Sequence, residues 1–474
     1  MRVIYSPTIF KVHGYVYTDG MRQTMHNVIL VLLTIYGCHS HEGHDHGNVA
    51  AEVLYEWLEV DYTWPNEMTR HKAIDERTFI PANNAIYGIR LFKNKSFLTT
   101  PRLKEGVPST LNFLVQVAST TSVTGYDILL RPYPSWAMQK LGDCNALQLV
   151  QNVEIDPLQG YMYIVDIGHT FKNSNSGVKC PAKLVIYDIV NDKEVHRHIF
   201  PEKVVRKDNN YLNDLVLDYV NGKASFLYIT DTLDLKLVVY DIRSDSSYFF
   251  HHMESMAPVM QYSNVTIAHE VVRVITGING IAISPNFTHV YYSAVAGVSV
   301  YQIPTSVLRN SKGGVKFGDA VRQVGSKPSQ GEGMIISKTG NMYFSALSEN
   351  AIYKWDFSND SITYGSEGNV KMDSVTLVIS NEYMQWVDSL ALDDTGYLWF
   401  TSSRFQRFFN PYYGHAYMES SYTVWRAFVF DKSYNDFRYI PTQAKVVENY
   451  ANDVSTCIGN ILLVIFLCLR SLFR

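Results

Sequence analysis

The sequence predicts an all-β protein, a six-bladed β-propeller of four-stranded antiparallel blades. The main observation is a pattern that recurs along the chain: a short apolar strand ending on a polar residue, a turn, and a second strand with a central aromatic residue. Clear copies occupy Val153–Asp166, Leu215–Asp231, Ile281–Ala294, Met334–Ala346 and Leu390–Ser402, and a weaker copy ends at Thr100. The copies end at positions 100, 166, 231, 294, 346 and 402, which are 66, 65, 63, 52 and 56 residues apart. This is the period of propeller blades with outer strands of variable length.

Size and composition agree with one large β domain. The chain has 474 residues, of which 46% are hydrophobic and 18% charged, so it can bury a large core and is too apolar for disorder. Length alone favours two or three domains, but a repeat that runs from about residue 85 to 430 indicates one. The formal net charge of -4 and the lack of a basic patch with interleaved aromatic residues argue against nucleic-acid binding.

The N-terminal residues 1–40 are predicted to be an export signal. The apolar run Val28–Tyr36 is too short to span a bilayer, and Arg22 precedes it. The residues before Met21 fit no usual signal, so the true start is expected at Met21. An uncleaved membrane anchor is the alternative. Residues 41–50 form a histidine-rich polar tail, and we expect the mature protein to be secreted and extracellular.

Two further features fit the secretory pathway. Four Asn-X-Ser/Thr sequons predict glycosylation; they begin at Asn94, Asn264, Asn286 and Asn359. Of the five cysteines, one leaves with the signal and two lie in the C-terminal tail. We therefore expect Cys144 and Cys180 to form a disulfide beside the strand pair Val153–Asp166. Two buried free thiols are the alternative.

The propeller is expected to occupy residues 51–440, followed by a tail over residues 441–474. The strand-like stretch Glu52–Asn66 is predicted to join the last blade and close the ring. In the tail, Ile458–Leu469 is apolar, but its twelve residues fall short of the roughly twenty needed for a spanning helix. We expect no stable anchor, and membrane association through this tail is the alternative. The oligomeric state is not predicted.

Several motifs carry a family resemblance. They are TPRLKEGVPSTLN at Thr100–Asn112, LRPYPSW at Leu130–Trp136, YIVDIG at Tyr163–Gly168, KCPAKLVIYD at Lys179–Asp188 and LWFTSSRFQRF at Leu398–Phe408. In this order they resemble the yellow/major royal jelly protein family. The resemblance implies a secreted six-bladed propeller, in agreement with the repeat count.

Local catalytic motifs do not point to an enzyme class, because the sequence has no nucleophile elbow, HExxH, phosphate loop or paired CxxC. In a propeller the ligand site lies at the mouth of the axial channel, where the inner strands converge. The polar residues expected just before the inner strands are Asn152, Asp214, Asn279, Glu332 and Asp388. Amides and carboxylates around one axis suit a divalent metal with oxygen ligands or a protonated amine. Alternatively, they cap strand ends.

The resemblance adds two candidate residues. Members of the family that bind serotonin and related amines use an aromatic ring and an Asn in a Ser-Asn-Arg-Phe motif. This chain reads Ser402-Ser403-Arg404-Phe405, so Phe405 matches, while Ser403 replaces the amide with a shorter hydroxyl.

Three hypotheses for function follow. In the first, a secreted yellow-like propeller binds a small aromatic amine or catechol-derived ligand in its axial pocket, with a role in cuticle pigmentation or dopachrome conversion and with no cofactor or bound metal. The second is a metal-dependent hydrolase of the lactonase type. The third is a structural or nutritive secreted protein without a small ligand.

Overall fold

The protein is described from a computed structural model over residues 49–119, 126–170, 179–310, 316–408 and 422–437. The chain divides into two units: Asn48–Phe437, and the terminal stretches Met1–Gly47 with Arg438–Arg474. Only the first unit is described below. The predicted signal region, nearly all of the histidine-rich tail, and the C-terminal tail lie outside the described residues.

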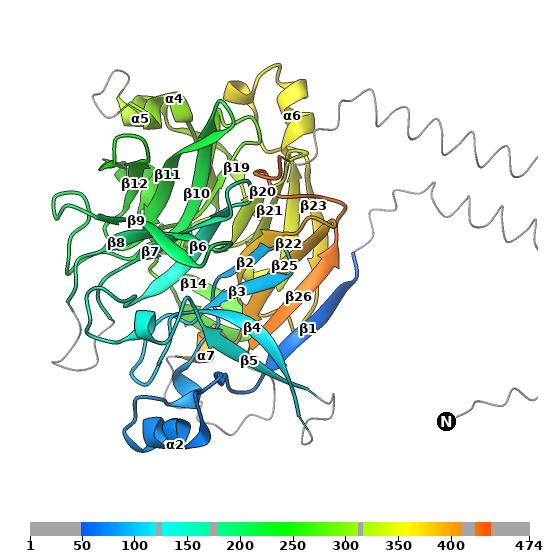
Figure 1. The fold of residues 1–474 in the computed structure, drawn as a ribbon. Coiled ribbons are helices and arrows are strands. Elements are labelled where there is room, and N and C mark those ends of the chain that lie inside the picture. Colours follow the sequence, from blue (N-terminus) through cyan, green and yellow to red (C-terminus); the bar gives the residue numbers. More distant parts are fainter. Residues whose placement is uncertain (1–48, 120–125, 171–178, 311–315, 409–421, 438–474) are drawn as a thin grey trace, which may run out of the picture. The chain divides into compact units, whose positions relative to one another are not determined.

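Six four-stranded antiparallel sheets make up the described unit, as predicted (Figure 1). In chain order the blades are β2 (Ile89–Phe92), β3 (Lys95–Thr99), β4 (Leu111–Ala118) and β5 (Tyr126–Pro132); β6 (Val150–Asp156), β7 (Tyr161–Asp166), β8 (Lys183–Asp188) and β9 (Lys193–Ile199); β10 (Leu212–Val220), β11 (Lys223–Asp231), β12 (Lys236–Asp241) and β13 (Ser246–His251); β16 (Ile278–Ile283), β17 (His289–Ala294), β18 (Ser299–Pro304) and β19 (Arg322–Ser326); β20 (Met334–Ile336), β21 (Asn341–Ala346), β22 (Ala351–Asp356) and β23 (Val375–Ser380); and β24 (Val387–Leu392), β25 (Tyr397–Ser403), β26 (Tyr422–Phe428) and β1 (Ala51–Trp57).

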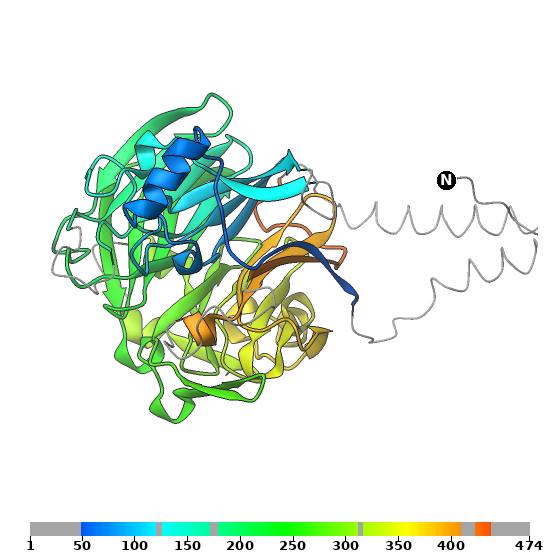
Figure 2. The ribbon, with the colours of Figure 1, turned by 90° about the horizontal axis from the view of Figure 1, so that it is seen from below.

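Shorter elements decorate the ends of the blades. They are the hairpin β14 (Asn264–Ile267) and β15 (Glu270–Arg273), and the helices α2 (Glu67–Asp75), α3 (Met253–Met256), α4 (Thr305–Leu308), α5 (Phe317–Ala320), α6 (Phe357–Thr363) and α7 (Phe405–Phe408). Helices α2 and α7 lie at one end of the described unit, the lower end in Figure 1, and face the viewer in Figure 2.

The blades close into a ring. Each first strand contacts the first strand of the next blade, and β24 contacts β2 to complete the circle. In Figure 2 the colours accordingly run round the unit from blue through green to orange. The last blade takes its outer strand from the start of the chain: β1 pairs with β26, with Ala51 opposite Ala427 and Trp57 opposite Tyr422. The prediction that the N-terminal strand closes the ring is therefore confirmed.

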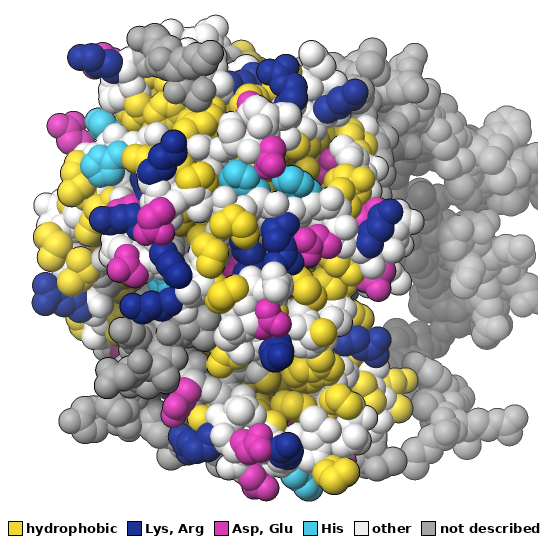
Figure 3. Space-filling model, turned by 60° about the vertical axis from the view of Figure 1, so that its left-hand side comes forward, with side chains coloured by type: hydrophobic (Ala, Val, Ile, Leu, Met, Phe, Trp, Pro, Cys, Tyr) yellow, Lys and Arg dark blue, Asp and Glu magenta, His cyan; other side chains and the backbone are white. Residues whose placement is uncertain are grey.

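Burial explains why the repeat was readable in the sequence. Inner and middle strands are covered by neighbouring blades on both faces, so β6 and β8 are buried throughout. Strands covered on both sides favour apolar runs, such as residues 184–187 of β8, although β6 also buries polar side chains. Outer strands such as β13 alternate between exposed and half-buried residues. On the face shown in Figure 3, Lys and Arg side chains are interspersed with Asp and Glu, without one dominant sign of charge.

Hydroxyl groups join neighbouring blades at the start of the inner strands. In the first blade, the Thr99 hydroxyl accepts from Gly88 N (2.8 Å) and donates to the Gln151 carbonyl of the second blade (2.6 Å). Thr230 repeats this arrangement, accepting from Asp214 N (3.1 Å) and donating to Asn279 O (2.9 Å). Thr401 does the same in the last blade, with Ser389 N (3.2 Å) and Tyr87 O (2.6 Å). In these three blades the threonine near the end of the repeat thus fixes the position of the adjacent blade.

The predicted disulfide is present. Cys144 and Cys180 are bonded with their Cα atoms 5.3 Å apart. Near this bond the buried Asp166 carboxylate accepts from the backbone amides of Gln148 (2.9 Å) and Leu149 (2.8 Å) and from Lys183 Nζ (2.6 Å). The disulfide and this carboxylate together hold the loop before β6 against the second blade.

The four sequon asparagines are all exposed, as glycan attachment requires, and glycosylation at Asn94, Asn264, Asn286 and Asn359 stays a prediction.

Over the described residues, we find no helix with the length and apolar character needed to cross a membrane.

Candidate functional site

A pocket of about 270 Å³ lies at one end of the propeller axis. Residues from four blades, from the loop before β16 and from α7 converge on it. They are Tyr87, Leu103, Tyr211, Asn213, Thr232, Leu233, Ile275, Thr276, Asn279, Glu332 and Phe405. We call this the mouth pocket. The closed ring is what brings these residues together, since they are widely separated in the sequence.

Two carboxyl groups form the acidic side of the mouth pocket, the buried Glu332 and the half-buried Asp388. Glu332 lines the pocket, and Asp388 is hydrogen-bonded to it. Burial raises the pKa of Glu332 to about 7, although hydrogen bonds from Trp386 and Asp388 and the charge of Lys327 lower it. Burial, followed by the charge of Glu332, raises the pKa of Asp388 well above its usual value. Near neutral pH this pair therefore holds a proton that an incoming cation would displace.

The nearby Lys327 does not neutralise the pair. Its ammonium donates to the Gly331 carbonyl at 3.0 Å, and no ion pair joins it to Glu332 among the described salt bridges. Burial lowers the pKa of Lys327 to about 7, against the charge of Glu332, which raises it. A buried ammonium without a carboxylate in contact is readily deprotonated, so the lysine and the carboxyl pair both titrate near neutrality.

Aromatic rings form the adjacent wall. The Phe405 ring packs edge-on against Tyr87 (5.0 Å between centroids) and against Trp386 (5.0 Å). Trp386 also donates from Nε1 to Glu332 Oε2 at 3.0 Å, so one side chain positions both the ring and the carboxylate. Its backbone is left-handed, with φ of 44°. Other non-glycine residues of the described chain also have positive φ, so this conformation sets the direction of the Trp386 side chain but does not by itself indicate a functional site.

Deeper along the axis, Arg90 of β2 contacts side chains of three other blades. Its guanidinium lies 3.5 Å from Glu154 Oε2 and 3.4 Å from Asp214 Oδ1, and it donates to Ser389 Oγ at 3.2 Å. Burial raises the pKa of Glu154 and of Asp214 to about 6, while Arg90 lowers both. These inner carboxylates are thus already paired with a cation of the protein.

At the opposite end, the segment after β26 lies against the far ends of inner strands. The Tyr434 hydroxyl accepts from Leu217 N at 3.0 Å, and Asn435 Nδ2 donates to Ile155 O at 2.9 Å. Phe437 packs on Tyr219, with 4.7 Å between ring centroids. Together with Arg90, this segment separates the mouth pocket from the other face of the ring.

A second, outer pocket of about 410 Å³ adjoins the mouth pocket, and the two share Ile275, Thr276, Glu332 and Phe405. Its other wall is the stretch Val271–Val274. Along this stretch Val271, Arg273 and Ile275 are the exposed positions, which places them on one side of the extended chain. The outer pocket therefore offers a guanidinium beside the aromatic wall.

The structure divides the residues predicted from the sequence into three groups. Glu332, Asn279 and Phe405 line the mouth pocket, and Asp388 supports Glu332. Asp214 lies deeper and binds Arg90, while Asn152 packs beside Gly88 and its Oδ1 lacks a hydrogen-bond partner in the described chain. Ser403 is absent from the lining; its backbone N donates to Gln385 O at 3.0 Å.

The predicted position of the polar residues needs one correction. Asn152, Asp214, Asn279 and Asp388 lie inside the inner strands rather than before them, and only Glu332 precedes its strand. In each of these four strands the pairing register shifts close to the polar residue, a bulge that re-aims its side chain. Sequence reasoning also missed Tyr87, Tyr211, Trp386 and Arg90. Tyr87 and Trp386 lie one or two residues before β2 and β24, which was a readable signal, but only polar residues were sought there.

A metal centre is not formed by the described residues: no group of three or more His, Cys, Asp or Glu side chains among them is placed to hold an ion. The lactonase hypothesis required three or four of the axial polar residues to converge within ligand distance. Instead, Arg90 contacts Asp214, and Asp388 contacts Glu332.

Comparison with known proteins agrees with this architecture. The chain is 25% identical over 369 residues to protein yellow of Drosophila erecta, covering 74% of this chain and 64% of that protein. It is 26% identical over 315 residues to major royal jelly protein 7 of Apis mellifera, covering 64% and 67%. The chain thus spans a little under two thirds of the length of the yellow proteins.

Among solved structures, a luciferin-regenerating enzyme matches with a TM-score of 0.42 and 13% identity, over 74% of this chain and 95% of that one. This similarity is too low to support a functional argument. The sequence model of the major royal jelly protein family matches residues 149–436, more than half of the chain, and this protein belongs to that family.

Proposed function

We propose that this protein is a secreted yellow-like propeller that binds a small aromatic amine or catechol-derived molecule in its mouth pocket. The observation that carries the proposal is that Glu332, hydrogen-bonded to Asp388, lines the same small pocket as the rings of Phe405 and Tyr87. Trp386 contacts both Phe405 and Glu332 and so holds the ring and the carboxylate in place. Carboxylates attract an ammonium group, and aromatic faces attract cations and stack on planar rings.

The size and polarity of the pocket support this class of ligand. A volume of about 270 Å³ suits a single ring with a short side chain, close to the lower limit for small-molecule sites. Burial keeps the hydroxyls of Tyr87 and Tyr211 protonated, since it raises both pKa values well above normal. Two phenol donors therefore face the same space as the carboxyl pair and complement catechol or indole hydroxyls.

Secretion is supported by the disulfide between Cys144 and Cys180, because such bonds persist in oxidising compartments. Immunoblotting of culture medium from cells that express the full chain tests this part. Retention of all of the protein inside the cells would contradict it.

Calorimetry with serotonin, dopamine and octopamine tests amine binding. Binding by the wild-type protein and its loss in Glu332→Gln are expected, because the amide keeps the shape of the carboxylate but not its charge. Glu349→Gln is the matched control, since Glu349 is an exposed carboxylate of the same blade. No heat with any of the three amines, or equal binding in Glu332→Gln, would overturn the proposal.

Dopachrome conversion is a second candidate function, favoured by the pKa of Glu332 near 7. A group of this pKa can take a proton from a ring carbon of an activated quinone and return it to oxygen, a tautomerisation that needs no oxidant. Arg273 in the outer pocket would meet the carboxylate of such a substrate. Following the loss of dopachrome colour tests this. Rates equal to the uncatalysed reaction would exclude catalysis while leaving binding intact.

A further inference from the structure

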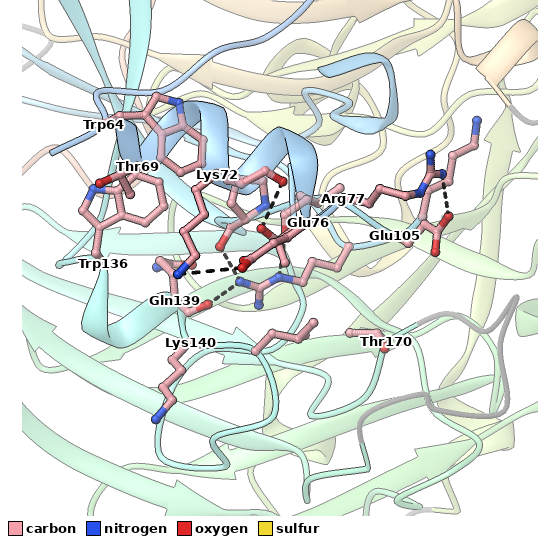
Figure 4. A pocket seen from close by; sticks show the side chains of 18 of the residues that line it. Trp64, Thr69, Lys72, Glu76, Arg77, Glu105, Trp136, Gln139, Lys140 and Thr170 are labelled. Atoms are coloured by element: carbon pink, nitrogen blue, oxygen red, sulfur yellow. Dashed lines mark hydrogen bonds and ion pairs between the residues drawn. The ribbon is translucent and has the colours of Figure 1, made fainter. Parts of the chain in front are cut away.

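A larger pocket lies outside the mouth pocket, between α2 and two loops of the first blade. It has a volume of about 900 Å³. One wall is a face of α2 with Thr69, Lys72 and Ala73, continued by the C-cap residue Glu76. The three- and four-residue spacing of these positions places their side chains on one side of the helix. Leu103–Pro108 and Ala137–Leu141 form the other walls (Figure 4). We call this the α2 pocket.

Two indole rings form one end of the α2 pocket. Trp64 and Trp136 lie 4.9 Å apart between ring centroids with planes 31° from parallel, and Figure 4 shows them side by side. Their ring nitrogens bond within the protein, Trp64 to Asp61 at 2.9 Å and Trp136 to Thr63 O at 3.3 Å. Both rings are half-buried, so they offer aromatic surface and no free donor. This end suits a planar apolar ring.

A buried guanidinium places a positive charge under the floor. Arg102 is 3% exposed, and each of its donors reaches a backbone carbonyl; the acceptors are Val107, Leu147, Gln148, Pro108 and Gln139. All N–H donors of the guanidinium are therefore bonded to neutral backbone carbonyls. The charge itself is not cancelled by a carboxylate in contact, so its field extends into the pocket.

The charges around the rim add to this field. Five lining residues are cationic and two are anionic; they are Lys72, Arg77, Arg102, Lys104 and Lys140, and Glu76 and Glu105. Each carboxylate lies near one exposed cation, Glu76 near Lys72 at 3.7 Å and Glu105 near Arg77 at 3.2 Å, so the excess positive charge comes from Arg102, Lys104 and Lys140. The lining thus carries a net formal charge of 5 − 2 = +3, in a chain with a net charge of -4.

We propose that the α2 pocket is a second ligand site, which takes a small planar aromatic carboxylate. The ring would lie at the indole end, and the carboxylate would face Lys72 above the Arg102 charge. This is the opposite of the mouth pocket, where buried carboxyl groups select a cation. Leu103 lines both pockets, so the two sites are neighbours with opposite charge preference.

Two probes of the same shape and opposite charge test the proposal. Indole-3-propionate and tryptamine share the indole ring and a two-carbon linker but end in a carboxylate and an ammonium. Calorimetry on the full chain is expected to show millimolar or tighter binding of indole-3-propionate, with the same affinity in the presence of saturating tryptamine. The affinity should fall as salt rises, since rim charges are exposed.

The variant Lys72→Gln tests whether indole-3-propionate binds in the α2 pocket. Removing one exposed charge contact is expected to weaken indole-3-propionate by about two- to fivefold, and Lys223→Gln, an exposed lysine in another blade, is expected to change nothing. Glu332→Gln is expected to leave the affinity for indole-3-propionate unchanged, which separates this test from the test of the mouth pocket.

No binding of indole-3-propionate, its displacement by tryptamine, or equal affinity in Lys72→Gln would each overturn the proposal. Melting temperatures of the variants verify folding. Lys72 is 71% exposed, so its replacement leaves the fold intact.

Discussion

Amine affinity is expected to depend on pH through the carboxyl pair of the mouth pocket. Burial raises the pKa of Glu332 to about 7. A bound ammonium favours the ionised carboxylate, so binding must displace the proton that Glu332 and Asp388 hold below that pH. A primary amine keeps its own charge throughout this range, as lysine does. Affinity therefore rises with pH through about 7 and levels off above that value.

The size of the effect follows from the titration. If one proton leaves a group with a pKa of about 7, the ionised fraction falls from about one half at pH 7 to about 3% at pH 5.5, so binding weakens about fifteenfold. Calorimetry in two buffers of different ionisation enthalpy measures the protons released per amine bound. About one is expected near pH 6. Fewer are expected in Glu332→Gln, where Asp388 is the one carboxyl group of the pair that is left, and whose affinity should be lower.

The same pKa predicts how stability changes without ligand. Glu332 binds a proton more tightly in the folded chain, at a pKa of about 7, than in the unfolded chain, at about 4.5. Because the folded state then holds more protons between these values, stability falls as pH rises from about 4.5 to 7. An affinity that stays constant from about pH 5.5 to 7, or the same affinity and proton release in Glu332→Gln as in the wild-type protein, would refute this reasoning.

Three further changes probe the scaffold and the ring wall. Thr230→Val removes the hydroxyl that joins two blades and leaves Asn279 O without its donor, so chemical denaturation is expected to show a loss of about 1–3 kcal/mol, against little change for the exposed Thr266→Val. Replacing both Cys144 and Cys180 by Ser opens a loop with a sequence separation of 36 and is expected to lower the unfolding free energy by about 4 kcal/mol; a loss below about 1 kcal/mol would contradict the loop-entropy estimate. Phe405→Leu keeps apolar volume but removes the ring, and amine affinity should fall about three- to tenfold in calorimetry; unchanged affinity would place the ligand away from this wall.

The ring of blades was predictable from the sequence because each blade needs the same pair of buried apolar strands, so the pattern recurs along the chain. The recurring strand pairs, the strand Ala51–Trp57 that closes the last blade, and the disulfide of Cys144 were all readable. Each depends on local apolar patterning or on residue type. The carboxyl pair was partly predictable, since Glu332 and Asp388 occupy equivalent places in neighbouring copies.

The partners of those carboxyl groups were not predictable. Arg90 lies in the weakest copy of the repeat, and its contacts with Glu154 and Asp214 exist only because the ring brings distant blades together. Trp386 takes a left-handed backbone that residue type does not indicate. Ser403 was carried over from a motif, but its side chain does not line the mouth pocket. The contacts of Arg90, the backbone of Trp386 and the position of Ser403 depend on how the closed ring packs, and not on the local sequence.

Charge compensation explains why the ligand should stop at the mouth instead of entering the axis. Glu154 and Asp214 are deeper acidic groups, but Arg90 already lies between them, and displacing a guanidinium from two buried carboxylates would leave charges without partners at a cost of several kcal/mol. The pair Glu332–Asp388 has no such cation in contact and holds a proton instead. Exchanging that proton for an ammonium group leaves the buried net charge unchanged. A cation therefore binds most favourably at the mouth, beside Phe405, where the exchange requires no rearrangement of the ring.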